Sequence, residues 1–82
     1  MMIDEQQFYQ SGREFLLERL GEAAEHVDAD TELVQSGLLD SLLVLEFFFF
    51  LENTRGAAIA PEAATVEVLS TLRSAYQLVV SP

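Results

Sequence analysis

Residues 42–51 form the longest apolar stretch of the chain, and only Glu46 interrupts it. The stretch is half the length of about 20 residues that a membrane-spanning helix needs, so we expect it to lie within a folded domain. Ser41 precedes the stretch and Gly56 follows it, and these residue types favour the start and the end of a helix. The sequence therefore predicts a strongly apolar helix from Ser41 to about Arg55, against which the rest of the chain must pack.

Four consecutive phenylalanines, residues 47–50, lie within this predicted helix. Four consecutive residues on a helix point in every direction, so they cannot all face one core. The spacing of the apolar residues predicts that Phe47, Phe50 and Leu51 face inward, and that Phe48 or Phe49 lies near the rim or in solvent. Aromatic rings are over-represented as interface anchors, so the exposed ring would suit a partner, although an overpacked core with one leftover ring is the alternative.

The rest of the chain also favours helices, because no segment shows a sustained period of two. We expect a first helix over residues 4–20 that stops at Gly21, a connection over residues 22–37 anchored at Val27 and Leu33, a short helix over residues 65–69, and a last helix capped by Ser70 and running to about Val80. Thr31 with Glu32 could start one further helical turn. A chain of 82 residues has room for one domain. Residues 1–82 are therefore predicted to form a single all-α domain, a small four-helix bundle with three longer helices and one short one.

The chain carries a net charge of −10, has no lysine, and contains only four scattered arginines. Phosphate backbones would repel such a surface, so we expect no nucleic acid partner. The acidic charge either steers basic protein partners or keeps a hydrophobic domain in solution, and both readings remain open. The chain has no cysteine, and its first residues lack the pattern of a signal peptide. We expect a monomeric, cytoplasmic domain that does not associate with membranes.

The sequence offers little support for metal binding or catalysis. Residues 28–32 alternate acids as calcium loops do, but Leu33 and Leu39 stand where such loops need glycine and glutamate. His26 is the only histidine, and one imidazole cannot build an ordinary transition-metal site. The glycines of a serine-hydrolase elbow are missing around Ser41. We predict no metal site and no catalytic residues, so the protein is not expected to be an enzyme.

Residues 36–42 read Ser-Gly-Leu-Leu-Asp-Ser-Leu and place Ser41 directly after Asp40 at the predicted helix start. We expect Ser41 to be the N-cap, accepting a hydrogen bond from an exposed amide. A phosphate on the same oxygen would also be favoured, because a helix N-terminus offers free amides and partial positive charge. An ordinary serine cap is the alternative. The long connection, the sharp bend that Gly37 allows and the length of the following helix favour a site at which a phosphate-linked group is covalently attached to Ser41.

This segment resembles the prosthetic-group attachment site of acyl and peptidyl carrier proteins, in which the serine after Asp carries a phosphopantetheine arm derived from coenzyme A. The resemblance covers nearly the whole chain. Residues 30–33 and 36–41 look like the approach to that serine, residues 51–52 and 56–59 like the end of the second helix and the turn beyond it, and residues 69–72 like the start of the last helix. It implies a four-helix bundle with a long first connection and no chemistry of its own.

The resemblance also implies a function. The chain would be a free-standing carrier that holds acyl or aminoacyl intermediates as thioesters on an arm attached to Ser41, in a specialised pathway of the polyketide or nonribosomal peptide type. Its partners would be a phosphopantetheinyl transferase, an acyl- or aminoacyl-loading ligase or transferase, and downstream biosynthetic enzymes. These enzymes would dock on the helix that follows the attachment serine, at positions that match Asp40, Leu42, Leu45, Glu46 and Phe49.

The residues before Asp40 depart from two branches of the family. Gly-Leu-Leu stands where fatty-acid carriers usually have Leu-Gly and one further residue, and the Gly-Gly-His or Gly-Gly-Asp of peptidyl carriers in large synthetases is absent. The cargo, acyl, aminoacyl or aryl, therefore stays open. An unmodified acidic helical adaptor, which binds one partner through the Phe-rich helix, is the alternative function.

Overall fold

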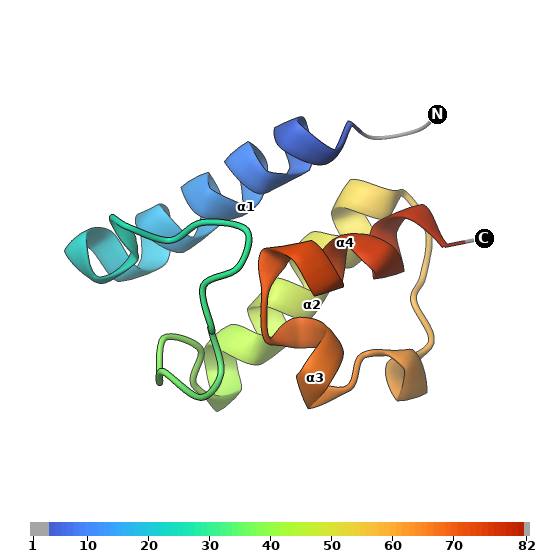
Figure 1. Ribbon diagram of the computed structural model, residues 1–82. Helices are drawn as coiled ribbons and strands as arrows, with labels where there is room; N and C mark the ends of the chain where they lie inside the picture. The colour runs from blue at the N-terminus through green and yellow to red at the C-terminus, as the bar shows by residue number, and fades with distance from the viewer. Residues whose placement is uncertain (1–3, 82) are drawn as a thin grey trace.

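The computed structural model describes residues 4–81, and the chain is all-helical over that range. It contains four α-helices and two 3-10 turns: α1 (Glu5–Leu20), η1 (Gly21–Ala24), α2 (Ser41–Arg55), η2 (Pro61–Ala63), α3 (Val66–Leu69) and α4 (Leu72–Val80). α1 and α2 run in opposite directions, and α4 lies alongside both (Figure 1). The predicted bundle of three longer helices and one short helix is confirmed.

Glycine ends the two longest helices, as the sequence predicted. Gly21 follows α1 with φ of 59°, and Gly56 follows α2 with φ of 76°. Residues other than glycine rarely adopt a positive φ, so each helix ends at a glycine, which adopts it readily. The position of these two residues in the sequence therefore fixes the length of both helices.

The cap of α4 differs from the prediction. Thr71, not Ser70, is the N-cap: its hydroxyl accepts from the Ser74 backbone N–H at 3.0 Å, and the Ser74 hydroxyl in turn accepts from the Thr71 N–H at 3.3 Å. The Ser70 hydroxyl instead donates to the Glu67 carbonyl at 2.6 Å, at the end of α3. Ser70 therefore closes the preceding helix and leaves the reciprocal cap to its neighbour.

The predicted helical turn at Thr31 and Glu32 is absent. The Asp28 carboxylate accepts from the Asp30 N–H at 2.8 Å, and Glu32 accepts from the amides of Val34 and Gln35. Side chains thus satisfy the backbone amides that a helical turn would otherwise use. The helical turn of this connection lies earlier, at η1, directly after Gly21.

The connection from α1 to α2 is nonetheless well anchored. Val27 and Leu33 are buried, as predicted, and Leu39 is buried just before α2 begins. The Leu33 N–H donates to the Ser70 carbonyl at 2.7 Å, and the Leu39 N–H donates to the Leu33 carbonyl at 2.8 Å. The connection is therefore tied to the α3–α4 corner just before it delivers the chain to the start of α2.

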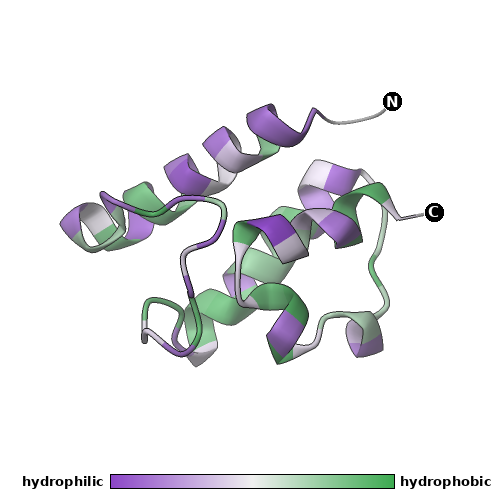
Figure 2. Cartoon of the chain, in the orientation of Figure 1, coloured by the Kyte–Doolittle hydropathy of each residue, from purple (hydrophilic) through white to green (hydrophobic). Residues whose placement is uncertain are grey.

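Aromatic rings fill the space between α1 and α2. Phe15 stacks on Phe50 with ring centroids 4.7 Å apart, and Phe47 lies 5.9 Å from Phe15. α1 and α4 approach more closely, since a Cβ added at Gly12 would lie 2.7 Å from the Leu72 Cδ2 atom. Figure 2 shows the hydrophobic colour along much of α2, which agrees with its apolar sequence. Aromatic rings therefore separate α1 from α2, whereas Gly12 allows α1 and α4 to pack closely.

Candidate functional site

The phenylalanine run divides between the core and the surface. Phe47 and Leu51 are fully buried, and Phe50 is half-buried against the core, so the predicted inward face is confirmed. Phe48 is half-buried, whereas Phe49 is 55% exposed. The structure therefore selects Phe49 as the solvent-facing ring.

The outer face of α2 is unusually apolar. Leu42 is 66% exposed and Leu45 is 50% exposed, and both lie on the same side of the helix as Phe49. These are three of the five positions at which the sequence predicted partner docking. The structure brings them together as one exposed apolar ridge, which we call the α2 ridge (Leu42, Leu45 and Phe49).

Asp40, not Ser41, is the N-cap of α2. Its backbone is extended, and its carboxylate Oδ1 accepts from the Leu43 N–H at 2.8 Å. Its carbonyl accepts from the Val44 N–H, also at 2.8 Å. The prediction that Ser41 caps the helix is wrong, because the carboxylate one residue earlier already holds the amide that a cap must reach.

Because Asp40 caps α2, the Ser41 hydroxyl is not needed as a cap. Ser41 is exposed as the first residue of α2, and its side chain makes no hydrogen bond within residues 4–81. Over the same range, the amides of Ser41 and Leu42 also have no acceptor. The first turn of α2 therefore presents an accessible hydroxyl beside two free N–H donors, where negative charge is stabilised.

No catalytic pair surrounds Ser41 in the described part of the chain. His26 is exposed on the first connection and makes no hydrogen bond to the serine. The four arginines bond elsewhere: Arg13 to the Glu25 carbonyl, Arg19 to Glu46, Arg55 to the Ala58 and Ser81 carbonyls, and Arg73 to Asp30.

Glu46, another predicted docking residue, forms an ion pair across helices. The Arg19 Nε atom of α1 lies 3.4 Å from the Glu46 carboxylate, and its guanidinium carbon lies 3.9 Å above the Phe15 ring. Both side chains are partly exposed, so the pair contributes little to stability. The pairing could not be read from the sequence, because Arg19 and Glu46 meet only when α1 packs beside α2.

An apolar groove of about 500 Å³ lies between α2 and the segment that contains η2 and α3, and Ser41 is one of the residues that line it. We call it the Ser41 groove. It is lined by Ser41, Val44, Leu45, Phe48, Phe49, Pro61, Ala64 and Leu69. The sequence indicated Ser41, Leu45 and Phe49 as functional residues. It gave no signal for the wall opposite α2, which is formed by Pro61, Ala64 and Leu69, because these residues reach α2 only through tertiary folding.

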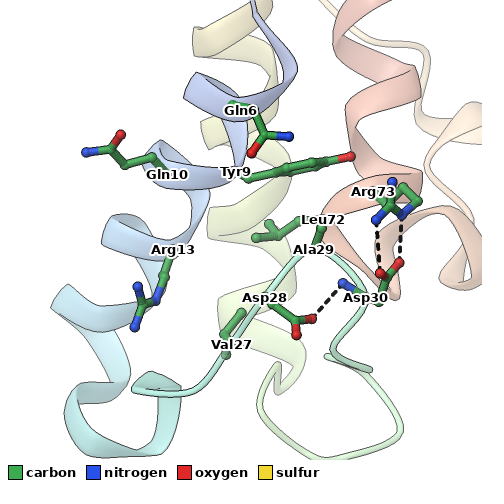
Figure 3. Close-up of a pocket in the computed structure, with 10 residues that line it drawn as sticks. All are labelled: Gln6, Tyr9, Gln10, Arg13, Val27, Asp28, Ala29, Asp30, Leu72 and Arg73. Atoms are coloured by element: carbon green, nitrogen blue, oxygen red, sulfur yellow. Dashed lines mark hydrogen bonds and ion pairs between the residues drawn. The ribbon is translucent and has the colours of Figure 1, made fainter.

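A second hollow, of about 590 Å³, lies between α1, the first connection and α4, and Ser41 does not line it (Figure 3). Its charged groups already bond within the chain. Arg73 donates to the Asp30 carboxylate through Nε at 2.7 Å and Nη2 at 2.9 Å, and this bonding lowers the pKa of Asp30. The Arg73 N–H also donates to the Ala29 carbonyl at 2.9 Å. The hollow is thus bordered by contacts that hold the connection to α4.

Two further features bear on function. No group of three or more His, Cys, Asp or Glu side chains within residues 4–81 is placed to hold a metal ion. None of the helices described is both long and apolar enough to cross a membrane.

Comparison with protein-family models, with curated proteins and with solved structures finds no match to this chain. The function is therefore inferred from the residues and geometry of the chain itself.

Proposed function

We propose that this chain is a cytoplasmic carrier protein, modified at Ser41 by phosphopantetheine, that presents acyl or aminoacyl intermediates to biosynthetic enzymes. One observation carries the proposal. The serine that follows Asp40 in the carrier-like sequence is the exposed first residue of α2, and its hydroxyl makes no hydrogen bond to any residue between 4 and 81. A serine that served only as a helix cap would be bonded to an amide of the first turn.

The surroundings of Ser41 fit a phosphate ester. The free amides of Ser41 and Leu42 can donate to phosphate oxygens, and the positive end of the α2 dipole favours the anion. The Asp40 carboxylate is committed to the Leu43 amide and holds the first turn in place. Buried Leu39 fixes the chain on the other side of Asp40. Ser41 is thus exposed between a capped first turn and a buried leucine two residues before it.

In the proposed modification this chain contributes only the Ser41 hydroxyl. Ser41 Oγ attacks the pantetheine-bearing phosphorus of coenzyme A, its proton passes to a base on the transferase, and adenosine 3′,5′-bisphosphate leaves. The attached arm supplies a thiol that can hold an acyl group as a thioester. The α2 ridge is then available to the loading and downstream enzymes, as is the second carboxylate oxygen of Asp40, since the Leu43 amide bonds only to Oδ1. Glu46 is available once it parts from Arg19.

The exposed α2 ridge also supports a second candidate, an unmodified adaptor that binds a partner protein. Three large apolar side chains at least half exposed on one helix face are a common feature of interaction sites. An adaptor would use this ridge but would not require a hydroxyl at residue 41. The two functions therefore differ in their dependence on Ser41.

Intact-mass measurement after incubation with coenzyme A and a permissive phosphopantetheinyl transferase separates the two functions. We expect a mass gain of one phosphopantetheine in the wild type and none in Ser41→Ala. Ser36→Ala is the matched control, because Ser36 is also exposed and lies in the same segment, and it should be modified normally. An unmodified wild type, or a modified Ser41→Ala, would refute the carrier proposal.

A further inference from the structure

We propose that Arg19 is a specificity-determining residue of this chain, because it holds the Glu46 carboxylate of α2 and competes for it with a basic side chain of the phosphopantetheinyl transferase. This inference rests on the carrier function proposed above and concerns one of its docking positions. A transferase that binds Glu46 through an arginine or a lysine must first displace Arg19. The transferase therefore recognises this chain less well than it would if Glu46 were free.

The ion pair places a cation from α1 directly on the helix that follows Ser41. The Arg19 Nε atom lies 3.4 Å from Glu46 Oε1, and the Arg19 guanidinium carbon lies 3.9 Å above the Phe15 ring. Within residues 4–81, no other cationic side chain pairs with Glu46. A carboxylate that is already neutralised at this distance attracts a second cation much less strongly than a free one. Arg19 thus masks Glu46.

Arg19 also has other partners that can hold it once it leaves Glu46. Its Nη1 atom lies 3.6 Å from the carboxylate of Glu18 and donates to the Phe15 carbonyl at 3.3 Å. Arg19 stands in the last turn of α1, where the helix dipole favours a cation. The guanidinium is therefore not stranded when the pair opens. Since the pair is also partly exposed, a partner can open it at small cost.

A third hollow, of about 520 Å³, gives a partner access to the masked carboxylate. It borders α2 on the side of α1, and Arg19, Glu46 and Phe49 are among the residues that line it. The Glu46 side chain is 44% exposed, so an incoming side chain can reach it without opening the core. Because Phe49 also belongs to the α2 ridge, a partner seated on that ridge lies beside Glu46. The competition takes place at the docking face itself.

Arg13 supplies the matched control. It lies on the same helix as Arg19 and is exposed, but its guanidinium donates to the Glu25 carbonyl at 2.6 Å and to no carboxylate among the described residues. Arg13→Gln and Arg19→Gln therefore make the same change in net charge. Only Arg19→Gln releases an acid on α2, so the two variants separate the unmasking of Glu46 from a general gain in negative charge.

The experiment measures kcat/KM of a permissive phosphopantetheinyl transferase for the full chain, with coenzyme A as the donor and intact mass as the readout. We expect Arg19→Gln to raise kcat/KM by roughly twofold to fivefold, the worth of an exposed ion pair, and Arg13→Gln to match the wild type. The gain should shrink when potassium chloride is raised from about 0.05 M to about 0.5 M, which shortens the screening length about threefold.

Arg19→Met separates charge from packing. Methionine keeps an unbranched side chain over the Phe15 ring but carries no charge, so it should give the same gain as Arg19→Gln. A gain in Arg19→Gln alone would show that uncovering the ring is responsible, and would overturn the proposal. No gain in either variant, or an equal gain in Arg13→Gln, would also overturn it.

A double-mutant cycle tests whether Arg19 acts through Glu46. Glu46→Gln should lower kcat/KM by a larger factor in the Arg19→Gln background than in the wild type, because only there is the carboxylate free to meet the transferase. Equal factors in the two backgrounds would mean that the two charges act independently, and would overturn the masking. Failure of the carrier function itself would show earlier, as a wild-type chain that gains no arm at Ser41.

Discussion

Phe47 and Phe49 stand two residues apart in one helix and have opposite surroundings. Phe47 is completely buried among the rings of Phe15 and Phe50, whereas Phe49 is mostly in solvent and borders the Ser41 groove. Two residues along a helix rotate the side chain by about 200°, so neighbours in a run of identical residues can take opposite roles. Chemical identity alone says nothing about which ring is structural.

This difference predicts opposite results for two alanine variants. Phe47→Ala should lower the free energy of unfolding by about 3–5 kcal/mol, because it leaves a cavity in the core. Phe49→Ala should leave the melting temperature within a few degrees of the wild type. Thermal and urea denaturation of the two variants would measure the contrast, and equal destabilisation would show that Phe49 is also a core residue.

Tyr9 gives the chain a titratable residue with a shifted pKa. Burial of the ring and the hydrogen bond from its hydroxyl to the Glu5 carboxylate, at 2.6 Å, raise the pKa of Tyr9 to about 12. The unfolded chain binds this proton with a pKa of about 10. The neutral phenol therefore stabilises the fold fully below pH 10, and this contribution disappears as the pH rises from 10 to 12.

We predict that the stability of the wild type falls between pH 10 and pH 12 and that Tyr9→Phe falls less steeply over the same interval. Ultraviolet absorbance titration of Tyr76→Phe, which leaves Tyr9 as the only tyrosine, should place the midpoint near pH 12. A midpoint near pH 10 would show that the ring is solvated and the bond to Glu5 is not formed.

At the scale of elements, the start of α2 separates two roles that the sequence assigned to one residue. Asp40 caps the helix through the Leu43 amide, and the Ser41 hydroxyl bonds to nothing within the described range 4–81. The helix thus depends on the carboxylate, and the serine can be modified without loss of the cap. This division of labour is what makes Ser41→Ala a clean test of attachment.

We predict that Asp40→Ala lowers the free energy of unfolding by about 1 kcal/mol, whereas Asp40→Asn, which keeps an acceptor, costs only a few tenths. Ser41→Ala should cost less than Asp40→Ala, since no hydrogen bond is lost. Urea denaturation of the three variants would measure these differences. A larger loss for Ser41→Ala than for Asp40→Ala would mean that the serine is the cap after all.

For the whole molecule, acidic charge is the dominant electrostatic feature. Fourteen acids face four arginines, and the net charge is −10 within a body of 33 × 25 × 18 Å. Two of the arginines, Arg13 and Arg55, donate to backbone carbonyls, so among the described residues they neutralise no carboxylate through a direct ion pair. Repulsion among carboxylates should therefore oppose folding more than the few exposed ion pairs assist it.

We predict that the melting temperature rises when potassium chloride is raised from about 0.01 M to about 0.1 M. Over this interval the screening length falls from about 30 Å to about 10 Å, that is, from the length of the molecule to a fraction of it. Sucrose at equal osmolality is the nonionic control for the salt series. A melting temperature that falls with salt would show that the ion pairs of Arg19 and Arg73 outweigh the repulsion.

The sequence by itself determined the helical class, the ends of α1 and α2 and the inward side of the phenylalanine run. Each of these depends on interactions within one segment: the left-handed backbone that Gly21 and Gly56 allow, and the spacing of apolar residues along one helix. It also singled out Ser41 and the α2 ridge, because a loop, an acid, a serine and an apolar helix are consecutive in the chain. The order of neighbouring residues along the chain was sufficient to predict these features.

Only the tertiary structure decided the remaining features. Whether Phe48 or Phe49 is exposed depends on how α2 is rotated against its neighbours, and one residue of phase is about 100° of rotation. The Arg19–Glu46 pair and the far wall of the Ser41 groove join residues from different elements. These features depend on distances between groups that the order of residues does not specify, and packing alone sets those distances.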